Sequence, residues 1–223
     1  MRRRLPWLIC ALLGACATPP AEPPDGWHPV TLPGKSPTQY RMTVKEGRTA
    51  IEARSERAAS LWRQHLSRAP SQLGVVEFSW WVQAAVPGAD IAQADREDAA
   101  ARVLFAFDGD HDRLSPRNRM LFDLAHALTG ERPPYATLMY VFGSATPEGS
   151  VVHGPRSDRV RKIVVDAGDA RARQWRTHRR DLVADFRLAF GEDPGPLLSV
   201  ALMTDSDNTG TGAMAWYGPV VLR

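Results

Sequence analysis

Residues 74–82 read Gly-Val-Val-Glu-Phe-Ser-Trp-Trp-Val, and this stretch indicates the fold most clearly. Val76, Phe78 and Trp80 fall on one face of an extended chain, because successive side chains of a strand point to opposite faces. Alternating β-branched and aromatic residues are typical of a half-buried strand. Trp81 must then point to the face opposite Trp80.

Similar stretches lie on both sides of this strand, separated by turn residues at irregular intervals. Residues 50–69 mix helical and extended spacing, and we favour two strands there over a helix. A series of short strands of this kind predicts a mainly β protein, a two-layer antiparallel β-sandwich of jelly-roll type. The other predicted strands cover residues 39–44, 102–107, 137–142, 161–166, 197–203 and 213–222.

Two segments carry helix signals, and we expect both helices to pack on the sandwich. Ser115 followed by Pro116 is a typical helix start, and Gly130 is a typical stop. The apolar residues between them recur at helical spacing. A second helix is predicted from about Thr177 to Phe190, with Gly191 after its end.

The N-terminus has the three parts of an export signal. Three arginines precede an apolar run of about nine residues, which is far shorter than the roughly 20 residues that span a bilayer. The segment Leu13-Gly14-Ala15-Cys16 resembles a bacterial lipobox. We expect a lipoprotein signal peptide over residues 1–15, lipidated Cys16 (by acyl chains such as palmitate) with a proline-rich tether over 16–26, and a single domain over 27–223. An ordinary secretory signal is the alternative.

The residue after the lipidated cysteine bears on the membrane that holds the protein. Ala17 stands there instead of aspartate, which by resemblance to Gram-negative sorting rules predicts the inner leaflet of the outer membrane, facing the periplasm. Loss of residues 1–15 removes three of the 28 Lys and Arg and none of the 25 Asp and Glu. The mature chain is therefore balanced in charge, which argues against a nucleic-acid partner.

Polar loops and spare tryptophans are the candidates for ligand binding. The loop Thr204–Gly210, Thr-Asp-Ser-Asp-Asn-Thr-Gly, offers acceptors and donors for sugar hydroxyls. Outward-facing indole rings stack on sugars, although tryptophan more often fills a core. Asp98 and Arg102 fit either a ligand site or a structural ion pair. The predicted ligand-binding residues are Trp81, Trp175, Asp98, Arg102, Asp205, Asp207 and Asn208.

Asp108, Asp110 and Asp112 form a second candidate site, for a structural Ca²⁺ ion. Alternating carboxylates after a strand can surround a cation that prefers six to eight oxygens. The alternative is a hydrated turn whose side chains bond their own backbone. We expect no other cofactor, since the chain carries neither a phosphate-binding loop nor a dinucleotide fingerprint.

Several short sequence motifs occur in the order typical of one bacterial exported family. They are Glu97-Asp98 before Ala101-Arg102-Val103, Pro134–Phe142, Trp175 with Arg180-Asp181, Phe190-Gly191, and Thr204–Thr209. Together they resemble the family called domain of unknown function 3047, over about residues 26–222. The resemblance implies a shared fold and export, and it implies no activity.

Three functions remain open from the sequence. The first is a non-catalytic module that binds a glycan or another component of the cell envelope. The second is a polysaccharide hydrolase, which needs two carboxylates in one cleft, with Asp98, Asp108, Asp205 and Asp207 as candidates. The third is a structural or assembly partner, which predicts a large exposed apolar patch.

Overall fold

The computed structural model describes residues 26–223. The predicted signal peptide, the lipidated Cys16 and the tether up to residue 25 lie outside the described residues. Within residues 26–223, no helix has both the length and the apolar character needed to cross a membrane.

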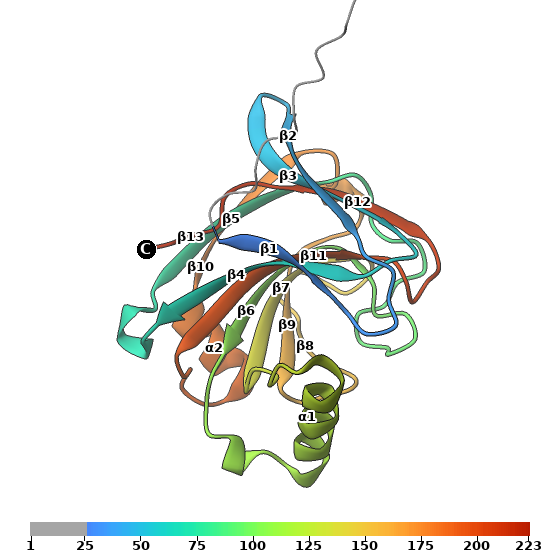
Figure 1. The fold of residues 1–223 in the computed structure, drawn as a ribbon. Coiled ribbons are helices and arrows are strands. Elements are labelled where there is room, and N and C mark those ends of the chain that lie inside the picture. The colour runs from blue at the N-terminus through green and yellow to red at the C-terminus, as the bar shows by residue number, and fades with distance from the viewer. Residues whose placement is uncertain (1–25) are drawn as a thin grey trace, which may run out of the picture.

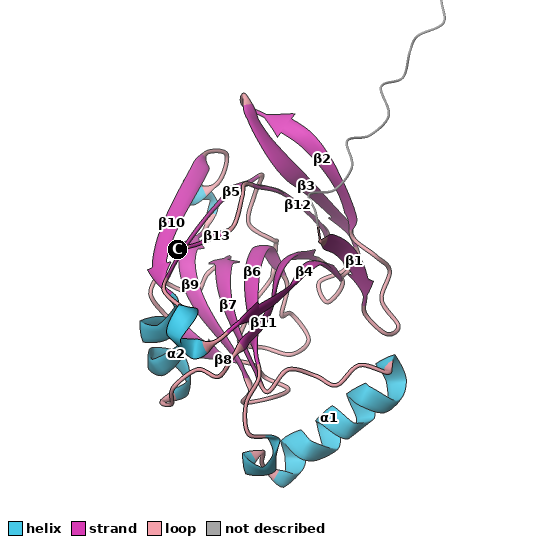
Figure 2. Cartoon of the chain, turned by 60° about the vertical axis from the view of Figure 1, so that its left-hand side comes forward, coloured by secondary structure: helices cyan, strands magenta, loops and turns pink. Residues whose placement is uncertain are grey.

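Two β-sheets are stacked face to face, as Figures 1 and 2 show. Sheet A has the strand order β1-β4-β11-β6-β7-β9-β8, and sheet B has the order β10-β5-β12-β3-β2 with β13 paired to β5. The strands of sheet A are β1 Trp27–Thr31, β4 Ser60–Arg68, β6 Ala99–Phe107, β7 Ala136–Gly143, β8 Val151–His153, β9 Val160–Ala167 and β11 Leu197–Asp205. Those of sheet B are β2 Gln39–Lys45, β3 Arg48–Glu56, β5 Val75–Val82, β10 Trp175–Asp181, β12 Gly212–Tyr217 and β13 Val221–Leu222.

The predicted sandwich is confirmed, and residues 50–69 contain β3 and β4 as expected. The short strands β1 and β8 and the polar strand β10 were not predicted. One pair, β7 with β9, is parallel rather than antiparallel. Between β7 and β9 in the chain comes β8, which pairs antiparallel with β9 at the edge of the sheet. Because β8 runs in the opposite direction, β9 runs in the same direction as β7.

Helix α1, Pro116–Thr129, begins and ends as predicted. Ser115 Oγ accepts a hydrogen bond from the Asn118 backbone N–H at 3.2 Å, and Gly130 ends the helix in the left-handed conformation with φ of 73°. A side chain at Gly130 would be strained there, because L-residues rarely adopt this conformation.

The second helix starts later than predicted. Helix α2 covers Leu182–Phe190, and residues 177–181 belong to β10 instead. Those residues pair with β5 at the edge of sheet B, so tertiary hydrogen bonds override the local helical pattern. Asp181 marks the true start, since its Oδ1 accepts from the backbone N–H groups of Val183 and Ala184.

Aromatic side chains fill the space between the sheets. Trp80 lies there with no exposed surface, as its position in the alternating stretch predicts. Its neighbours in this core include Phe78, Phe105, Tyr140 and Tyr217, all of them about 1% exposed or less.

Asp166 on β9 joins the two sheets through a buried polar contact. It accepts hydrogen bonds from Trp80 Nε1 at 2.8 Å and Arg176 Nε at 2.9 Å, and it lies 2.7 Å from His178 Nε2. Burial favours a higher pKa for Asp166, but the bonds from His178, Trp80 and Arg176 outweigh burial and hold the pKa below its ordinary value. The carboxylate therefore stays ionised and ties sheet A to sheet B.

The two helices relate differently to the sandwich. Phe186 of α2 is buried in the core. Helix α1 lies apart from α2, below sheet A in Figure 1 and at the bottom of the molecule in Figure 2. Met120, Leu124 and Leu128 on α1 remain 65%, 55% and 65% exposed, so part of its apolar stripe does not reach the core.

Candidate functional site

A groove of about 1370 Å³ covers the outer face of sheet A. One row of its floor crosses five strands in register: His28, Arg63, Ala201, Leu104 and Met139. The walls are formed by residues 28–35, 131–134 and 154–157, by the inner side of α1, and by the loop at 205–208.

Strand alternation explains which residues line this groove. In β6, Val103 and Phe105 point into the core, so Arg102, Leu104 and Ala106 must point outward. The floor is mostly aliphatic, with polar groups near its ends. Among the described residues that line the groove, none is a tryptophan, tyrosine or phenylalanine.

The end of the groove near residue 205 holds a buried ion pair. Arg102 Nη2 lies 2.9 Å from Asp205 Oδ2, and Arg102 Nε lies 3.1 Å from Asp205 Oδ1. The two side chains are only 3% and 5% exposed. Burial raises the pKa of Asp205 to about 7, while the Arg102 guanidinium acts in the opposite direction.

Asp98 shapes the loop that follows Asp205. Its carboxylate accepts from the backbone N–H groups of Asn208 and Thr209 and from the Thr209 hydroxyl. Asp207 forms an ion pair with Lys35. The structure thus brings Asp98, Arg102, Asp205, Asp207 and Asn208 together, as five of the seven predicted ligand-binding residues.

Oxygens of Asp98, Asp205 and Asp207 lie within 4.8 Å of one another, which is close enough to hold a metal ion. Each carboxylate, however, has a hydrogen-bond or ion-pair partner in the protein. The cluster therefore already stabilises the loop through groups of the chain itself.

Lys162 adds a second buried ion pair beside this cluster. Its Nζ lies 2.6 Å from Glu97 Oε1, and the Lys162 side chain has no exposed surface. Burial lowers the pKa of Lys162 to about 8, with Arg102 acting in the same direction and Glu97 against it. Glu97 also lies 3.6 Å from Arg156 at the rim of the groove. Lys162 was missed from the sequence, although a lysine directly before the apolar run Ile163–Val165 of a predicted strand is a signal that a buried partner exists.

Trp81 and Trp175, the other two predicted ligand-binding residues, do not line the groove, so the structure does not bring them together with the polar loop. They pair with each other across β5 and β10 in sheet B, on the other side of the sandwich. Trp81 packs edge-on against Trp216, with ring centroids 5.0 Å apart. Trp81 is only 7% exposed, so it belongs to a closed cluster on the outer face of sheet B.

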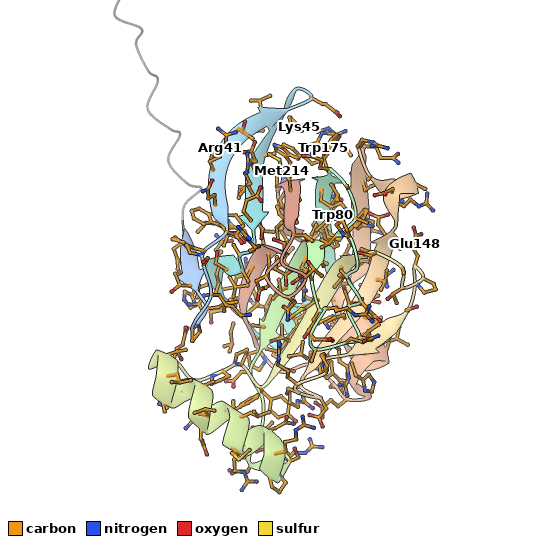
Figure 3. The ribbon with its side chains drawn as sticks, turned by 90° about the vertical axis from the view of Figure 1, so that its right-hand side faces the viewer. Arg41, Lys45, Trp80, Glu148, Trp175 and Met214 are labelled. Carbon is orange, nitrogen blue, oxygen red and sulfur yellow. The ribbon has the colours of Figure 1, made fainter. Side chains whose placement is uncertain are left out.

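Cations from the hairpin of β2 and β3 cover these rings. Lys45 Nζ lies 3.6 Å from the ring centroid of Trp81 and 4.2 Å from that of Trp216. The guanidinium of Arg48 lies 5.2 Å from the Trp175 ring. Figure 3 shows Lys45 and Trp175 close together in this part of the molecule. The ring faces that were expected to stack on sugars are therefore occupied by cations.

Asp108, Asp110 and Asp112 have the geometry of a hydrogen-bonded turn. Asp110 Oδ1 accepts from the Asp112 backbone N–H at 3.0 Å and caps the short 3₁₀ helix His111–Arg113. Asp108 Oδ1 accepts from the Gly109 N–H at 2.9 Å. These three carboxylates do not form a metal-sized cluster of the kind found at Asp98, Asp205 and Asp207 in residues 26–223.

The four carboxylates considered for glycoside hydrolysis do not form an open pair. Asp98 and Asp205 are buried, at 0% and 3% exposed. Asp108 follows β6, whereas Asp98 precedes it, so the length of the strand separates them. Within the described part of the chain, these four residues lack the exposed facing carboxylates that such chemistry requires.

Sequence reasoning missed the basic residues at the other edge of the groove. His28 on β1 lies directly opposite Arg63 on β4, and His65 follows two residues later on the same strand. Glu131, just after α1, forms an ion pair with Arg63. Leu61, Arg63 and His65 alternate along a strand, which is the signal that would place them on one face.

Two kinds of solved structure show low similarity to this chain. A family 11 carbohydrate-binding module from Clostridium thermocellum, in complex with a mixed-linked tetrasaccharide, has 9% identity and a TM-score of 0.43, covering 89% of each chain. The xyloglucanase domain of NopAA from Sinorhizobium fredii has 10% identity and a TM-score of 0.44, covering 92% of this chain and 97% of that one. Endoglucanase 3 of Trichoderma harzianum, from family GH12, has 9% identity and a TM-score of 0.45, covering 92% and 94%.

Identities and TM-scores this low say nothing of what the present chain binds. No curated protein matches it in sequence. A family model, described as "Protein of unknown function (DUF3047)", matches residues 25–221. The chain therefore belongs to the DUF3047 family, as the order of its sequence motifs predicts.

Proposed function

We propose that this protein is an exported lipoprotein, attached through Cys16, whose sandwich is a non-catalytic binding module for a cell-envelope glycan. The observation that carries the binding proposal is the groove on the outer face of sheet A. Its volume of about 1370 Å³ exceeds the roughly 300–1,000 Å³ of small-molecule sites, which favours a chain-like ligand.

The lining of the groove indicates how a glycan would be held. Leu104, Met139 and Ala201 offer an aliphatic floor for the C–H faces of sugar rings. Asn208 and Arg156 at the rim offer donors and acceptors for hydroxyl groups. Recognition would then rest on hydrogen bonds at the rim, without aromatic stacking.

Thermal unfolding of the full chain in mild detergent, with defined envelope oligosaccharides, tests this proposal. A ligand at 100 times its dissociation constant adds about 2.7 kcal/mol to the free energy of unfolding, a rise of roughly 5–10 °C in Tm for a chain of this size. Ala106→Trp should abolish the rise by filling the groove, because Ala106 is a half-buried residue of its floor. Ala170→Trp, at an exposed site away from the groove, is the matched control. A rise that survives Ala106→Trp would refute the groove as the site.

The membrane proposal rests on the lipobox-like segment ending at Cys16 and on Ala17 after it. We expect the mature protein to carry acyl chains on Cys16 and to fractionate with the outer membrane, on its periplasmic side. Mass spectrometry of the mature N-terminus, with Cys16→Ser as control, checks the attachment. A mature chain that starts elsewhere without lipid would contradict it.

An assembly partner is the second candidate function, favoured by the exposed stripe of Met120, Leu124 and Leu128 on α1. A protein that packs on this stripe would protect those side chains in the assembled envelope. Crosslinking of the full chain in cells, compared with Leu124→Lys, tests this function separately. Equal crosslinking of both chains would exclude the stripe as a contact.

A further inference from the structure

Three basic side chains gather where β1 and β4 border the groove. His28 and Arg63 face each other directly across the two strands. The rings of His28 and His65 stack, with centroids 5.2 Å apart and an angle of 18° between them. Arg63, His28 and His65 all line the groove, and Arg132 lines it beside the end of α1.

The Arg63 guanidinium is incompletely satisfied by the protein. Its Nη1 lies 3.0 Å from Glu131 Oε1, while its Nε is buried and has no hydrogen-bond partner among the described residues. A buried donor without an acceptor is unfavourable. An oxyanion that reached this side chain would supply the missing acceptor, and guanidinium groups bind carboxylate and phosphate oxygens in pairs.

The pKa of His65 reflects both burial and the neighbouring basic groups. Burial lowers its pKa first, and the charges of Arg63 and His28 lower it further, with only Glu131 acting in the opposite direction. Lys35, Arg102 and Arg156 each have an acidic partner elsewhere in the groove. At the β1–β4 edge, the acidic group beside Arg63 and His65 is the exposed Glu131.

Glu131 occupies the place that an anionic ligand would take. It follows Gly130 at the end of α1, and its side chain is 53% exposed, whereas that of Arg63 is 17% exposed. An ion pair with one exposed partner contributes little to stability, so a ligand can exchange for Glu131 at low cost. Glu131 thus resembles an internal substitute for a ligand group.

We propose that Arg63, His28 and His65 form a subsite for an anionic group of the ligand, a carboxylate or a phosphate, which displaces Glu131. This proposal rests on the proposed function, because it names the chemistry of the glycan that the groove takes. The ligand is then an acidic sugar chain, oriented with its charged unit against β1 and β4.

A matched pair of probes separates charge from shape. Tetragalacturonic acid carries carboxylates, and its methyl ester has the same size without the charge. We expect the full chain in mild detergent to bind the acid at least about tenfold more tightly than the ester, as a lost charge-assisted hydrogen bond would cost. Equal affinities for both probes would overturn the subsite while leaving the groove as a glycan site. Binding of neither these probes nor a phosphorylated mannose oligosaccharide would overturn the subsite, whereas thermal unfolding with envelope oligosaccharides decides the proposed function separately.

Two variants should give results of opposite sign, and a third is the control. Arg63→Gln should weaken binding of the acid about tenfold and binding of the ester far less, so that the preference for the acid is lost, while circular dichroism checks that the variant is folded. Glu131→Gln should tighten binding of the acid several-fold, because it removes the competing carboxylate. Glu148→Gln is the matched control, since Glu148 also pairs with an arginine, Arg171, but lies outside the groove. A Glu131→Gln variant that binds the acid more weakly would contradict the exchange.

A second measurement is independent of any sugar. The pKa of His65, followed by NMR of labelled histidine, should rise when inorganic phosphate replaces chloride at equal ionic strength. In Glu131→Gln the pKa should start lower, because Glu131 raises it, and the rise on adding phosphate should be larger. A rise with phosphate but preference for the uronate probe assigns carboxylate as the natural group, whereas tighter binding of a phosphorylated mannose oligosaccharide assigns phosphate. An unchanged His65 pKa in both proteins would overturn the subsite.

Discussion

The outer faces of the two sheets both combine charged and apolar side chains, but the face of sheet A is open and that of sheet B is closed. On sheet A, the charged residues pair at the ends of an open groove with an aliphatic floor. On sheet B, Trp81 and Trp216 are covered by Lys45, so aromatic rings and cations close the surface together. Residue type alone would favour sheet B as a glycan site. What decides is whether neighbouring side chains already occupy the surface that a ligand would use.

The largest expected effect comes from breaking the ion pair at the end of the groove. Arg102→Met leaves the buried Asp205 carboxylate without its partner, so the free energy of unfolding should fall by about 3–5 kcal/mol. Urea unfolding followed by circular dichroism measures this loss. The double variant Arg102→Met with Asp205→Leu should recover most of it, and a double variant no more stable than the single one would contradict the explanation.

Replacing a tryptophan on the outer face of sheet B should lower the free energy of unfolding without changing ligand binding in the groove. Trp81→Ala removes a buried ring, at a cost of about 3 kcal/mol in the same unfolding measurement. Ligand binding in the groove, measured below the lowered Tm, should be unchanged. Loss of binding in this variant would show that the two faces are not independent.

Lys45 tests whether cations really close the tryptophan face. Lys45→Ala should lower the free energy of unfolding by about 1 kcal/mol, because it removes contacts with two rings. It should also increase quenching of tryptophan fluorescence by acrylamide, as the rings of Trp81 and Trp216 become accessible. Lys35→Ala, which removes a lysine at the groove, is the control. Equal quenching in Lys45→Ala and the unmodified chain would mean that other atoms cover the rings.

The smallest change in the free energy of unfolding is expected on the exposed face of α1, beside the groove. Leu124 is 55% exposed, so Leu124→Ser should change the free energy of unfolding by less than about 0.5 kcal/mol. Phe186→Ser on the buried helix α2 is the comparison and should be strongly destabilising. A large loss for Leu124→Ser would show that α1 packs more closely than its exposure implies.

The sandwich could be predicted because its main strands alternate clearly. Residues 74–82 place Trp80 inside and Trp81 outside by period alone. Strand β10 could not be found in this way, since Trp-Arg-Thr-His-Arg-Arg-Asp has little apolar character and is held by pairing with β5. The start of α2 was missed because the capping role of Asp181 was overlooked.

The candidate site was predictable only in part. Asp98, Asp205 and Asn208 meet, and their polar character in loops beside strands suggested this. The basic edge at Arg63 depends on which strands become neighbours, because β1 and β4 are far apart in the chain. The closure of the tryptophan face depends on how the turn between β2 and β3, two strands of sheet B, places Lys45 and Arg48 against the rings. Neither is a local property of the sequence.

The position of β11 in sheet A determines when the groove can exist. This strand lies between β4 and β6 and pairs with both, although β7 to β10 separate it from β6 in the chain. Until β11 pairs with them, Arg63 and Leu104 belong to separate strand pairs, β1–β4 and β6–β7, with unpaired edges, which are prone to aggregate. Pairing over such sequence separations is slow. The two halves of the groove floor are therefore joined only where β11 pairs with β4 and β6, and a chain without β11 would lack a continuous floor.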